Sequence, residues 1–339
     1  MTYGGAYGLD LSFGGGIPAD LDALFDQTKS LAARPRTITE LPGGLTNRNY
    51  KVATRDGTFV ARISSGGSEL LAIDRDCEYR NSVTAAAAGA GAPVVEYRPQ
   101  DRLLVIGYLE GRTYGAADVA AHENIPRIAD ACRRLHHGAR FGNDFDMFDI
   151  QRRYLSVARA RGFKIPAGYD DLLPQFTAAE KALAIRRERP GSEGPASEGP
   201  AFEGPAPEGT VPCNNDLLPA NLIDDGERIW LIDYERSGNN DACFELGNIA
   251  AEAQLSAGAL EELVTAYYGR PRRSKTARAW LLGGLVGMYG WTLWGAIQNG
   301  ASPIDYDFWS WAMERFEGAA RGFTAASFKD LLEAVQEDD

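Results

Sequence analysis

"VPCNNDLLPANLIDD", residues 211 to 225, and the "GERIWLIDYE" that follows it decide the fold. Asp216 stands five residues before Asn221, so one loop can present both side chains, and the strand "RIWLI" leads to Asp233. Phosphoryl transfer requires ligands for the metal ions that hold nucleotide phosphates, and an aspartate that receives the proton of the acceptor hydroxyl. The pattern therefore predicts a phosphoryl-transfer site. A plain β-hairpin is the alternative, because Asp and Asn are ordinary turn residues.

The composition excludes several classes of protein. A chain of 339 residues is long enough for about two domains or lobes. Its 44% hydrophobic and 24% charged residues are typical of a soluble globular protein. The net charge of -12 opposes binding to nucleic acid. The four cysteines and three histidines have no zinc-binding spacing, so we expect reduced thiols and a cytoplasmic location.

The order of patterns along the chain predicts two lobes. Residues 37–63 alternate apolar and polar positions around glycine turns, which indicates an antiparallel sheet. A helix that includes Leu70, Ile73 and Cys77 follows, and then two more strands, "PVVEY" and "RLLVIGY". Beyond residue 107 the periodicity is mostly helical. We therefore expect an N-terminal lobe at 21–107 and a C-terminal lobe at 108–339.

Two segments do not fit either lobe. Residues 1–20 are rich in glycine and contain no secretory signal, so we interpret them as a flexible lead-in. Residues 190–209 repeat Glu, Gly, Pro and Ala with almost nothing to bury. We expect a disordered surface insert there, either a tolerated insertion without function or a segment near the mouth of the site.

The expected small lobe contains a candidate phosphate site. In "PGGLTNRNYKV", Gly43 and Gly44 let backbone N–H groups approach phosphate oxygens closely, although a simple hairpin has the same pattern. Arg62 ends a strand and Glu78 lies on the next helix. A strand cation held by a helix carboxylate positions phosphates in kinase small lobes. Two unrelated surface charges are the alternative.

An uncharged stretch, residues 279–304, is long enough to cross a membrane and equally suits a helix buried in a helical lobe. Within it, Trp291 and Trp294 share one helical face and can hold an ammonium group by cation–π attraction, unless they are core residues. Glu252 is the candidate acid beside them, unless it is a solvated helix charge.

Taken together, these motifs resemble the choline and ethanolamine kinases, within the aminoglycoside-phosphotransferase-like group. The matching pieces are "GGLTNRNYKV", "ARI", Glu78, "NNDLLPANLI", "LIDYE", "FELGNIAAE" and "GWTLWGAIQ". The resemblance implies an α+β, two-lobed protein-kinase-like fold, with a small antiparallel-sheet N-lobe and a larger, mostly helical C-lobe. It also implies ATP and magnesium (Mg2+) as cofactors, and it favours a buried helix over a membrane span.

The resemblance assigns roles to individual residues. Asp216 is the expected catalytic base, Asn221 and Asp233 are the expected metal ligands, and Asn214 braces the loop. The acceptor would bind at Glu252, Trp291 and Trp294. The nucleotide-binding residues would be Gly43, Gly44, Thr46, Asn47, Arg62, Glu78 and Tyr108. Arg62 stands where most kinases use lysine, and the family uses arginine there.

Two departures from the family pattern affect the expected function. The family motif reads His-Asn-Asp where this chain reads Asn214-Asn215-Asp216, so asparagine replaces the histidine. A further pocket tyrosine, expected soon after Glu252 in the family, has no counterpart in this chain. Because asparagine keeps a donor and an acceptor on a shorter stem, we expect the chemistry to be retained. The leading hypothesis is an ATP-dependent kinase of choline or a related cationic amino alcohol. A kinase of another hydroxyl compound, such as an aminoglycoside, and a ligand-binding pseudokinase are the alternatives.

Overall fold

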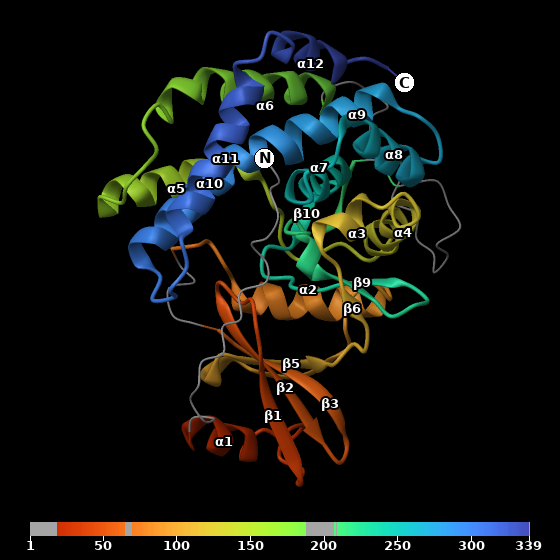
Figure 1. Ribbon diagram of the computed structural model, residues 1–339, viewed down its shortest axis with the longest axis vertical. Coiled ribbons are helices and arrows are strands. Elements are labelled where there is room, and N and C mark those ends of the chain that lie inside the picture. Colours follow the sequence, from red (N-terminus) through yellow and green to blue (C-terminus); the bar gives the residue numbers. More distant parts are fainter. Residues whose placement is uncertain (1–18, 65–69, 188–206, 208, 339) are drawn as a thin grey trace.

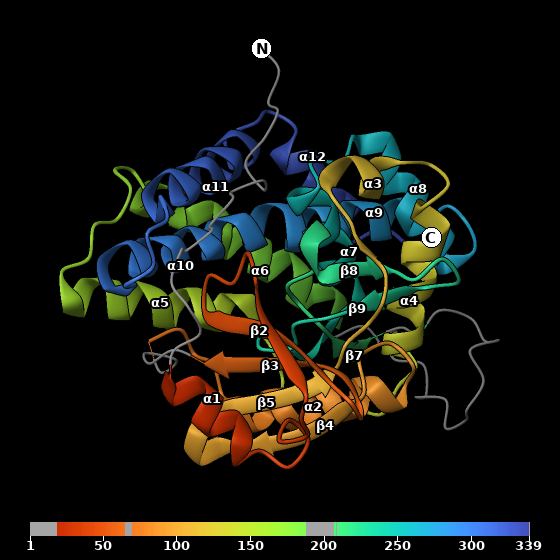
Figure 2. The ribbon, with the colours of Figure 1, turned by 60° about the horizontal axis from the view of Figure 1, so that its bottom comes forward.

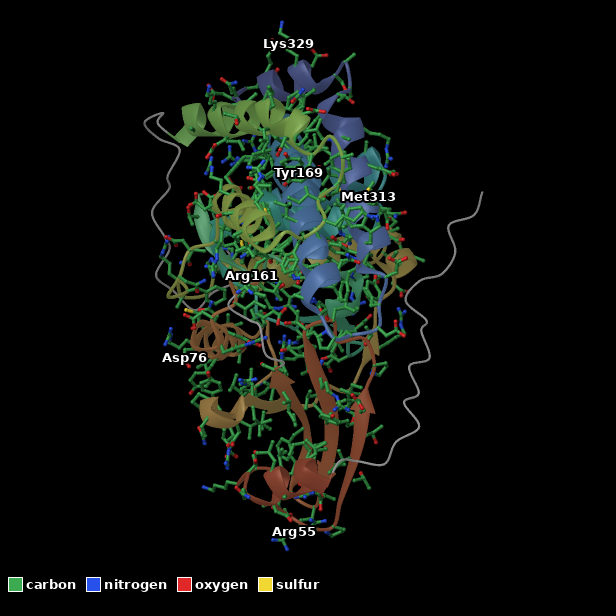
Figure 3. The ribbon with its side chains drawn as sticks, turned by 90° about the vertical axis from the view of Figure 1, so that its left-hand side faces the viewer. Arg55, Asp76, Arg161, Tyr169, Met313 and Lys329 are labelled. Carbon is green, nitrogen blue, oxygen red and sulfur yellow. The ribbon has the colours of Figure 1, made fainter. Side chains whose placement is uncertain are left out.

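The computed structural model describes residues 19–64, 70–187, 207 and 209–338, which form a small sheet-rich lobe and a larger helical lobe (Figure 1). The expected α+β, two-lobed fold is confirmed. Arg55 at the tip of the small lobe and Lys329 on the last helix mark opposite ends of the molecule (Figure 3). Apart from a few residues, the expected lead-in and insert lie outside the described ranges.

The small lobe is built on an antiparallel sheet with the strand order β1-β2-β3-β5-β4. The strands are β1 Arg36–Leu41, β2 Asn47–Thr54, β3 Gly57–Ser64, β4 Val94–Arg98 and β5 Leu103–Gly107. Helix α1, Ala19–Asp26, packs Phe25 into the same core as Tyr50, Val52 and Val105. Alternation along the strands thus buries one face of the sheet, as the sequence predicts.

Helix α2, Arg75–Ala87, lies between the sheet and the large lobe (Figure 1). The prediction that Leu70 and Ile73 belong to this helix is wrong, because the helix begins at Arg75. Asp74 is in an extended conformation, and its side chain accepts hydrogen bonds from the backbone N–H groups of Asp76 and Cys77. An N-cap of this kind satisfies donors that have no partner inside the helix, so the helix begins after Asp74.

The large lobe is mostly helical, as predicted. Its helices are α3 Ala116–Ala120, α4 Ile125–His136, α5 Met147–Arg161, α6 Leu173–Arg187, α7 Ala242–Glu252, α8 Ala257–Tyr268, α9 Arg273–Ala279, α10 Gly287–Ala301, α11 Phe308–Phe323 and α12 Phe328–Ala334. Helix α10 lies between α5 and α11 in the middle of the lobe (Figure 2).

Short strands around the predicted site join the helices. Strands β6 Arg112–Thr113, β8 Leu222–Asp224 and β9 Ile229–Leu231 form one small sheet, and β7 Thr210–Cys213 pairs with β10 Gly238–Asp241. The sequence predicts β8 and β9 only. Strand β10 has the sequence "GNND", which lacks the β-branched and aromatic residues that indicate strands.

The uncharged stretch is a buried part of this lobe. A π-helical segment, Trp280–Val286, joins α9 to α10. Its backbone contacts α7 directly: a Cβ on Gly283 would stand 2.2 Å from Asn248 N, and one on Gly247 would stand 1.8 Å from Ala279 O. Glycine is required at both positions because a methyl group has no room. In the described part of the chain, no helix combines the length and apolarity needed to cross a membrane.

Candidate active site

The loop after β7 holds Asp216 through a strained neighbour. Asn215 is in the left-handed region, with φ +67°, which is unfavourable for a residue other than glycine. Its side chain donates to the backbone oxygens of Arg236 and Gly238 and accepts from Asn240 Nδ2 at 2.9 Å. These buried hydrogen bonds hold the loop in a conformation that it would not adopt alone.

Asn214 links this loop to the segment after β9. Its Nδ2 donates to Ile232 O at 3.1 Å and to Asp233 O at 3.0 Å, while its Oδ1 accepts from Asp216 N at 3.1 Å. The amide therefore uses both its donor and its acceptor between the two expected functional aspartates. These contacts are those of a brace, the role that the sequence analysis expects for Asn214.

Helix α7 fixes the same loop from behind. Glu245 Oε2 accepts from Asn215 N at 2.9 Å, and Asn248 Oδ1 accepts from Leu217 N at 2.9 Å. Sequence reasoning missed both residues. The sequence feature that could have identified them is an acid and an amide three positions apart in the apolar helix "ACFELGNIAAE". Polar side chains that are buried in such a helix need hydrogen-bond partners.

Glu245 belongs to a buried cluster with His136 of α4 and Cys213 of β7. His136 Nε2 lies 3.2 Å from Glu245 Oε1 and 3.6 Å from Cys213 Sγ, and His136 Nδ1 lies 2.7 Å from the hydroxyl of Tyr267. The sequence spacing gives no indication of this cluster. Hydrogen bonds supply each member with a partner, so the cluster supports the loop through Glu245.

Asp216 has an unusual electrostatic environment. Burial and the nearby carboxylates of Asp233, Glu252 and Glu235 raise its pKa to about 8, against the opposing charge of Arg236. A carboxylate with its pKa near neutrality is suited to accept a proton. Arg236 is itself held by Leu71 O and by the Tyr154 hydroxyl, the latter at 2.7 Å.

The expected metal ligands are Asn221, which contacts Asp216 directly, and Asp233, which is linked to Asp216 through Asn214. Asn221 donates from Nδ2 to Asp216 O at 2.7 Å. Asp233 is in the left-handed region with φ +66°, and its side chain stays 29% exposed. A carboxylate and an amide oxygen are the hard ligands that Mg2+ prefers, so the donor set fits the metal.

The expected phosphate cation, Arg62, is buried among carboxylates. Its Nη2 lies 2.5 Å from Asp233 Oδ1 and 3.0 Å from Glu235 Oε2, and its Nε lies 3.2 Å from Glu78 Oε1, outside hydrogen-bond alignment. Arg75 also contacts both Glu78 and Glu235. The alternative of two unrelated surface charges for Arg62 and Glu78 is therefore wrong.

Glu235 joins the two lobes and was not assigned a role from sequence. Its carboxylate accepts from Thr46 Oγ1 and from Asn47 Nδ2, both at 2.8 Å. Burial acts to raise the pKa of Glu235, but Arg62 and the other nearby cations lower it to about 2. Glu235 thus holds several groups of the small lobe that the sequence analysis assigns to the nucleotide.

The remaining nucleotide-site residues lie on the small lobe. Gly43 has φ +98°, and a Cβ on Gly44 would stand 2.0 Å from Asn47 O, so the turn requires both glycines. Gln298 of α10 donates to Leu45 O at 3.1 Å and ties this turn to the large lobe. Tyr108 is half-buried after β5, with Lys51 Nζ 3.7 Å from its ring centroid.

The residues expected to bind the acceptor are buried on neighbouring helices. Trp291 and Trp294 are 5% and 7% exposed, and the N–H of each indole has no hydrogen-bond partner in the described part of the chain. The guanidinium carbon of Arg236 lies 5.5 Å from the Trp291 ring centroid. Glu252 pairs with Arg315 at 2.6 Å. The alternative of a solvated charge is therefore wrong for Glu252, and sequence reasoning missed its partner.

Comparison with known proteins assigns the fold and the family. The phosphotransferase enzyme family model matches residues 37–276. The crystal structure of a choline/ethanolamine kinase family protein from Mesorhizobium loti is 28% identical, with a TM-score of 0.76 over 94% of this chain and 98% of that one. Choline kinase LicA from Streptococcus pneumoniae, at 20% identity and a TM-score of 0.71, shares the fold over 90% of this chain and 99% of that one.

Sequence comparison finds similar proteins whose names include LicA and ethanolamine kinase. Protein LicA from Haemophilus influenzae is 27% identical over 232 residues, which are 66% of this chain and 61% of that protein. Human ethanolamine kinase 1 is 29% identical over 83% of this chain and 66% of its own length. The chain thus spans about three fifths of the length of the first relative.

Proposed function

Because the chain belongs to the phosphotransferase enzyme family, we propose that it transfers the γ-phosphoryl group of ATP to the hydroxyl of choline or a related amino alcohol. The observation that carries the proposal is the position of Asp216, which is hydrogen-bonded to Asn221 and, through Asn214, linked to the backbone of Asp233. The names of the relatives, choline and ethanolamine kinases, support the choice of acceptor.

Asp216 is the proposed general base. In this role its carboxylate accepts the proton of the acceptor hydroxyl as that oxygen attacks phosphorus. Arg236, which lowers the pKa of Asp216 against the effect of burial, keeps part of the population ionised. The brace at Asn214 and the contacts of Asn215 fix the direction of the carboxylate, because positioning supplies much of the catalysis in this reaction class.

Asn221 and Asp233 are the proposed ligands of Mg2+, with Arg62 beside them on the phosphate side. When bound, the metal would neutralise charge on the phosphate oxygens. The partial exposure of Asp233 supports this assignment, because a carboxylate needed only for packing has no reason to occupy a strained and solvent-accessible position. The turn at Gly43 and Gly44 would bring backbone N–H groups to the phosphates.

Trp291, Trp294 and Glu252 are the proposed acceptor side. Buried N–H donors without a partner are costly in a closed core. Trp291 and Trp294 both belong to the hydrophobic core, so the unpartnered indole N–H groups are the feature that supports a ligand-facing side of α10. The aromatic faces would attract the ammonium group of the acceptor.

The test is an ADP-release assay with choline, ethanolamine and an aminoglycoside, applied to the wild type and to Asp216→Asn. We expect turnover with an amino alcohol in the wild type, a loss of at least about 1000-fold in Asp216→Asn, and nearly unchanged ATP affinity. Turnover with the aminoglycoside alone would favour the other hydroxyl kinase. ATP binding without turnover of any acceptor would favour the pseudokinase.

A further inference from the structure

Glu252 already holds a cation that belongs to the protein. Arg315 of α11 donates from Nη2 to Glu252 Oε2 at 2.6 Å, and the two side chains are only 9% and 6% exposed. The guanidinium carbon of Arg315 lies 3.4 Å from the ring centroid of Trp311. Arg315 thus has the two partners, a carboxylate and an aromatic face, that a bound ammonium group would require.

This pair borders the proposed acceptor side. The ring centroids of Trp311 and Trp294 are 4.8 Å apart with the rings inclined at 60°, and Phe308 lies 5.8 Å from Trp294. Burial is the largest cause of the raised pKa of Asp216, and the negative charge of Glu252 is a further cause. Glu252 is therefore near the proposed reacting centre. Arg315 is therefore placed to change how the acceptor's cation is recognised.

We propose that Arg315 makes the acceptor site selective for a quaternary ammonium alcohol over a primary one. This inference rests on the proposed amino-alcohol kinase function. Arg315 occupies Glu252 with a short, buried ion pair, so the carboxylate is engaged before any acceptor arrives. Recognition of the acceptor's cation then falls mainly on aromatic faces such as that of Trp294, which, unlike Trp291 and Trp311, has no guanidinium over its ring in the described part of the chain.

The selectivity follows from the hydrogen-bonding capacity of the two kinds of cation. A quaternary ammonium group has no N–H donor and is held well by aromatic faces. A primary ammonium group has three N–H donors, and each donor that is buried without an acceptor weakens binding. Because Arg315 engages Oε2 of Glu252 and its guanidinium offsets the charge of that carboxylate, fewer acceptors remain for the three donors of a primary ammonium group.

The first test uses the wild-type protein and a series of acceptors with increasing methylation: ethanolamine, its N-methyl and N,N-dimethyl derivatives, and choline. We expect kcat/KM to rise along the series, with choline at least about tenfold above ethanolamine. Equal values, or a preference for ethanolamine, would overturn the proposal and leave the kinase function intact. Turnover of none of the four would overturn the kinase function itself.

The second test changes the arginine. In Arg315→Gln the carboxylate of Glu252 is released, so the ratio of kcat/KM for ethanolamine to that for choline should rise about tenfold. Arg315→Lys keeps the charge and should leave the ratio near the wild-type value. The matched control is Arg321→Gln, on the exposed side of the same helix, which should change nothing.

Loss of folding in Arg315→Gln would be visible by circular dichroism. In that case the double variant Arg315→Gln with Glu252→Gln, which leaves no unpaired buried charge, replaces it. Its ratio should stay near the wild-type value, because neither the cation nor the carboxylate remains. An unchanged ratio in a folded Arg315→Gln, or a raised ratio in the double variant, would remove Arg315 from the selectivity role.

Discussion

At the scale of single residues, the shifted pKa of Asp216 has a direct kinetic consequence. Burial and neighbouring carboxylates raise this pKa to about 8, so the proposed base is mostly protonated at pH 6 and mostly ionised at pH 9. We therefore expect kcat/KM for the acceptor to rise roughly tenfold per pH unit below about pH 7 and to level off above pH 8. A profile that is flat from pH 6 to 9 would contradict the assignment.

The same shift affects stability. A carboxyl group with a pKa that rises from 3.8 to about 8 on folding stabilises the folded state at low pH, and this contribution is lost as the pH rises toward 8. Asp216→Asn removes the ionisation. The variant should gain about 1 to 2 kcal/mol over the wild type at pH 8 and little at pH 4, measured by thermal unfolding at both values.

The two tryptophans should respond differently to the same substitution. Trp294→Leu should raise KM for choline roughly five- to thirty-fold, leave KM for ATP unchanged and lower stability modestly, because leucine keeps part of the buried volume but has no aromatic face. Trp291→Leu removes the ring near Arg236, which Tyr154 and Leu71 also hold, so it should lower the melting temperature as well. If the KM values for choline and for ATP rise together in Trp294→Leu, the indole serves only the packing of the core.

At the scale of elements, the close contact of α7 with the end of α9 and the π-helical segment positions the proposed catalytic loop. A Cβ on Gly247 would collide with Ala279 O at 1.8 Å, so Gly247→Ala must move α7, which carries Glu245 and Asn248. We expect a loss of at least about 2 kcal/mol in unfolding free energy and a fall in kcat that exceeds any change in ATP binding. The measurements are urea unfolding and single-turnover kinetics.

Gly258→Ala is the matched control, since it also places alanine for glycine inside a helix. The nearest atom to its Cβ would be Ser256 Oγ at 4.0 Å, so the methyl group has room. Helix propensity then predicts a gain of about 0.5 to 1 kcal/mol. Equal losses in the two variants would show that the close approach at Gly247 has no special role.

The strands and the site loop show which parts of the structure the sequence could predict. Strands β1 to β3 follow from alternation and β4 and β5 from short apolar runs, while the loop with Asp216 and Asn221 and the strand before Asp233 follow from the motif spacing. Strands β7 and β10 do not follow, because both are only four residues long, "TVPC" contains a proline and "GNND" is polar. The partners of functional residues were missed for a related reason: Glu235, Glu245 and Arg315 contact segments far away in the sequence, which local patterns do not reveal.

At the scale of the whole molecule, Glu235 connects the lobes. Its pKa is lowered from 4.5 to about 2, so its contribution to stability is complete above pH 4.5 and is lost as the pH falls through 2. Glu235→Gln should cost about 3 to 5 kcal/mol at pH 7, because buried Arg62 and half-buried Arg75 each lose a partner, and much less near pH 2. Glu227→Gln, at an exposed position, is the control. Equal costs at both pH values would exclude this role.

The contacts of Glu235 also predict an order of events during folding. Thr46 and Asn47 are 189 and 188 residues away from it along the chain, and Arg62 is 173 residues away. Forming contacts between residues so far apart in the sequence requires a large loss of chain entropy, because a long loop must close. Such contacts are expected to form after local helices and hairpins. The nucleotide site should therefore assemble last, so that in stopped-flow refolding ATP binding recovers more slowly than the far-ultraviolet circular dichroism of the helices. Simultaneous recovery of both signals would contradict this order.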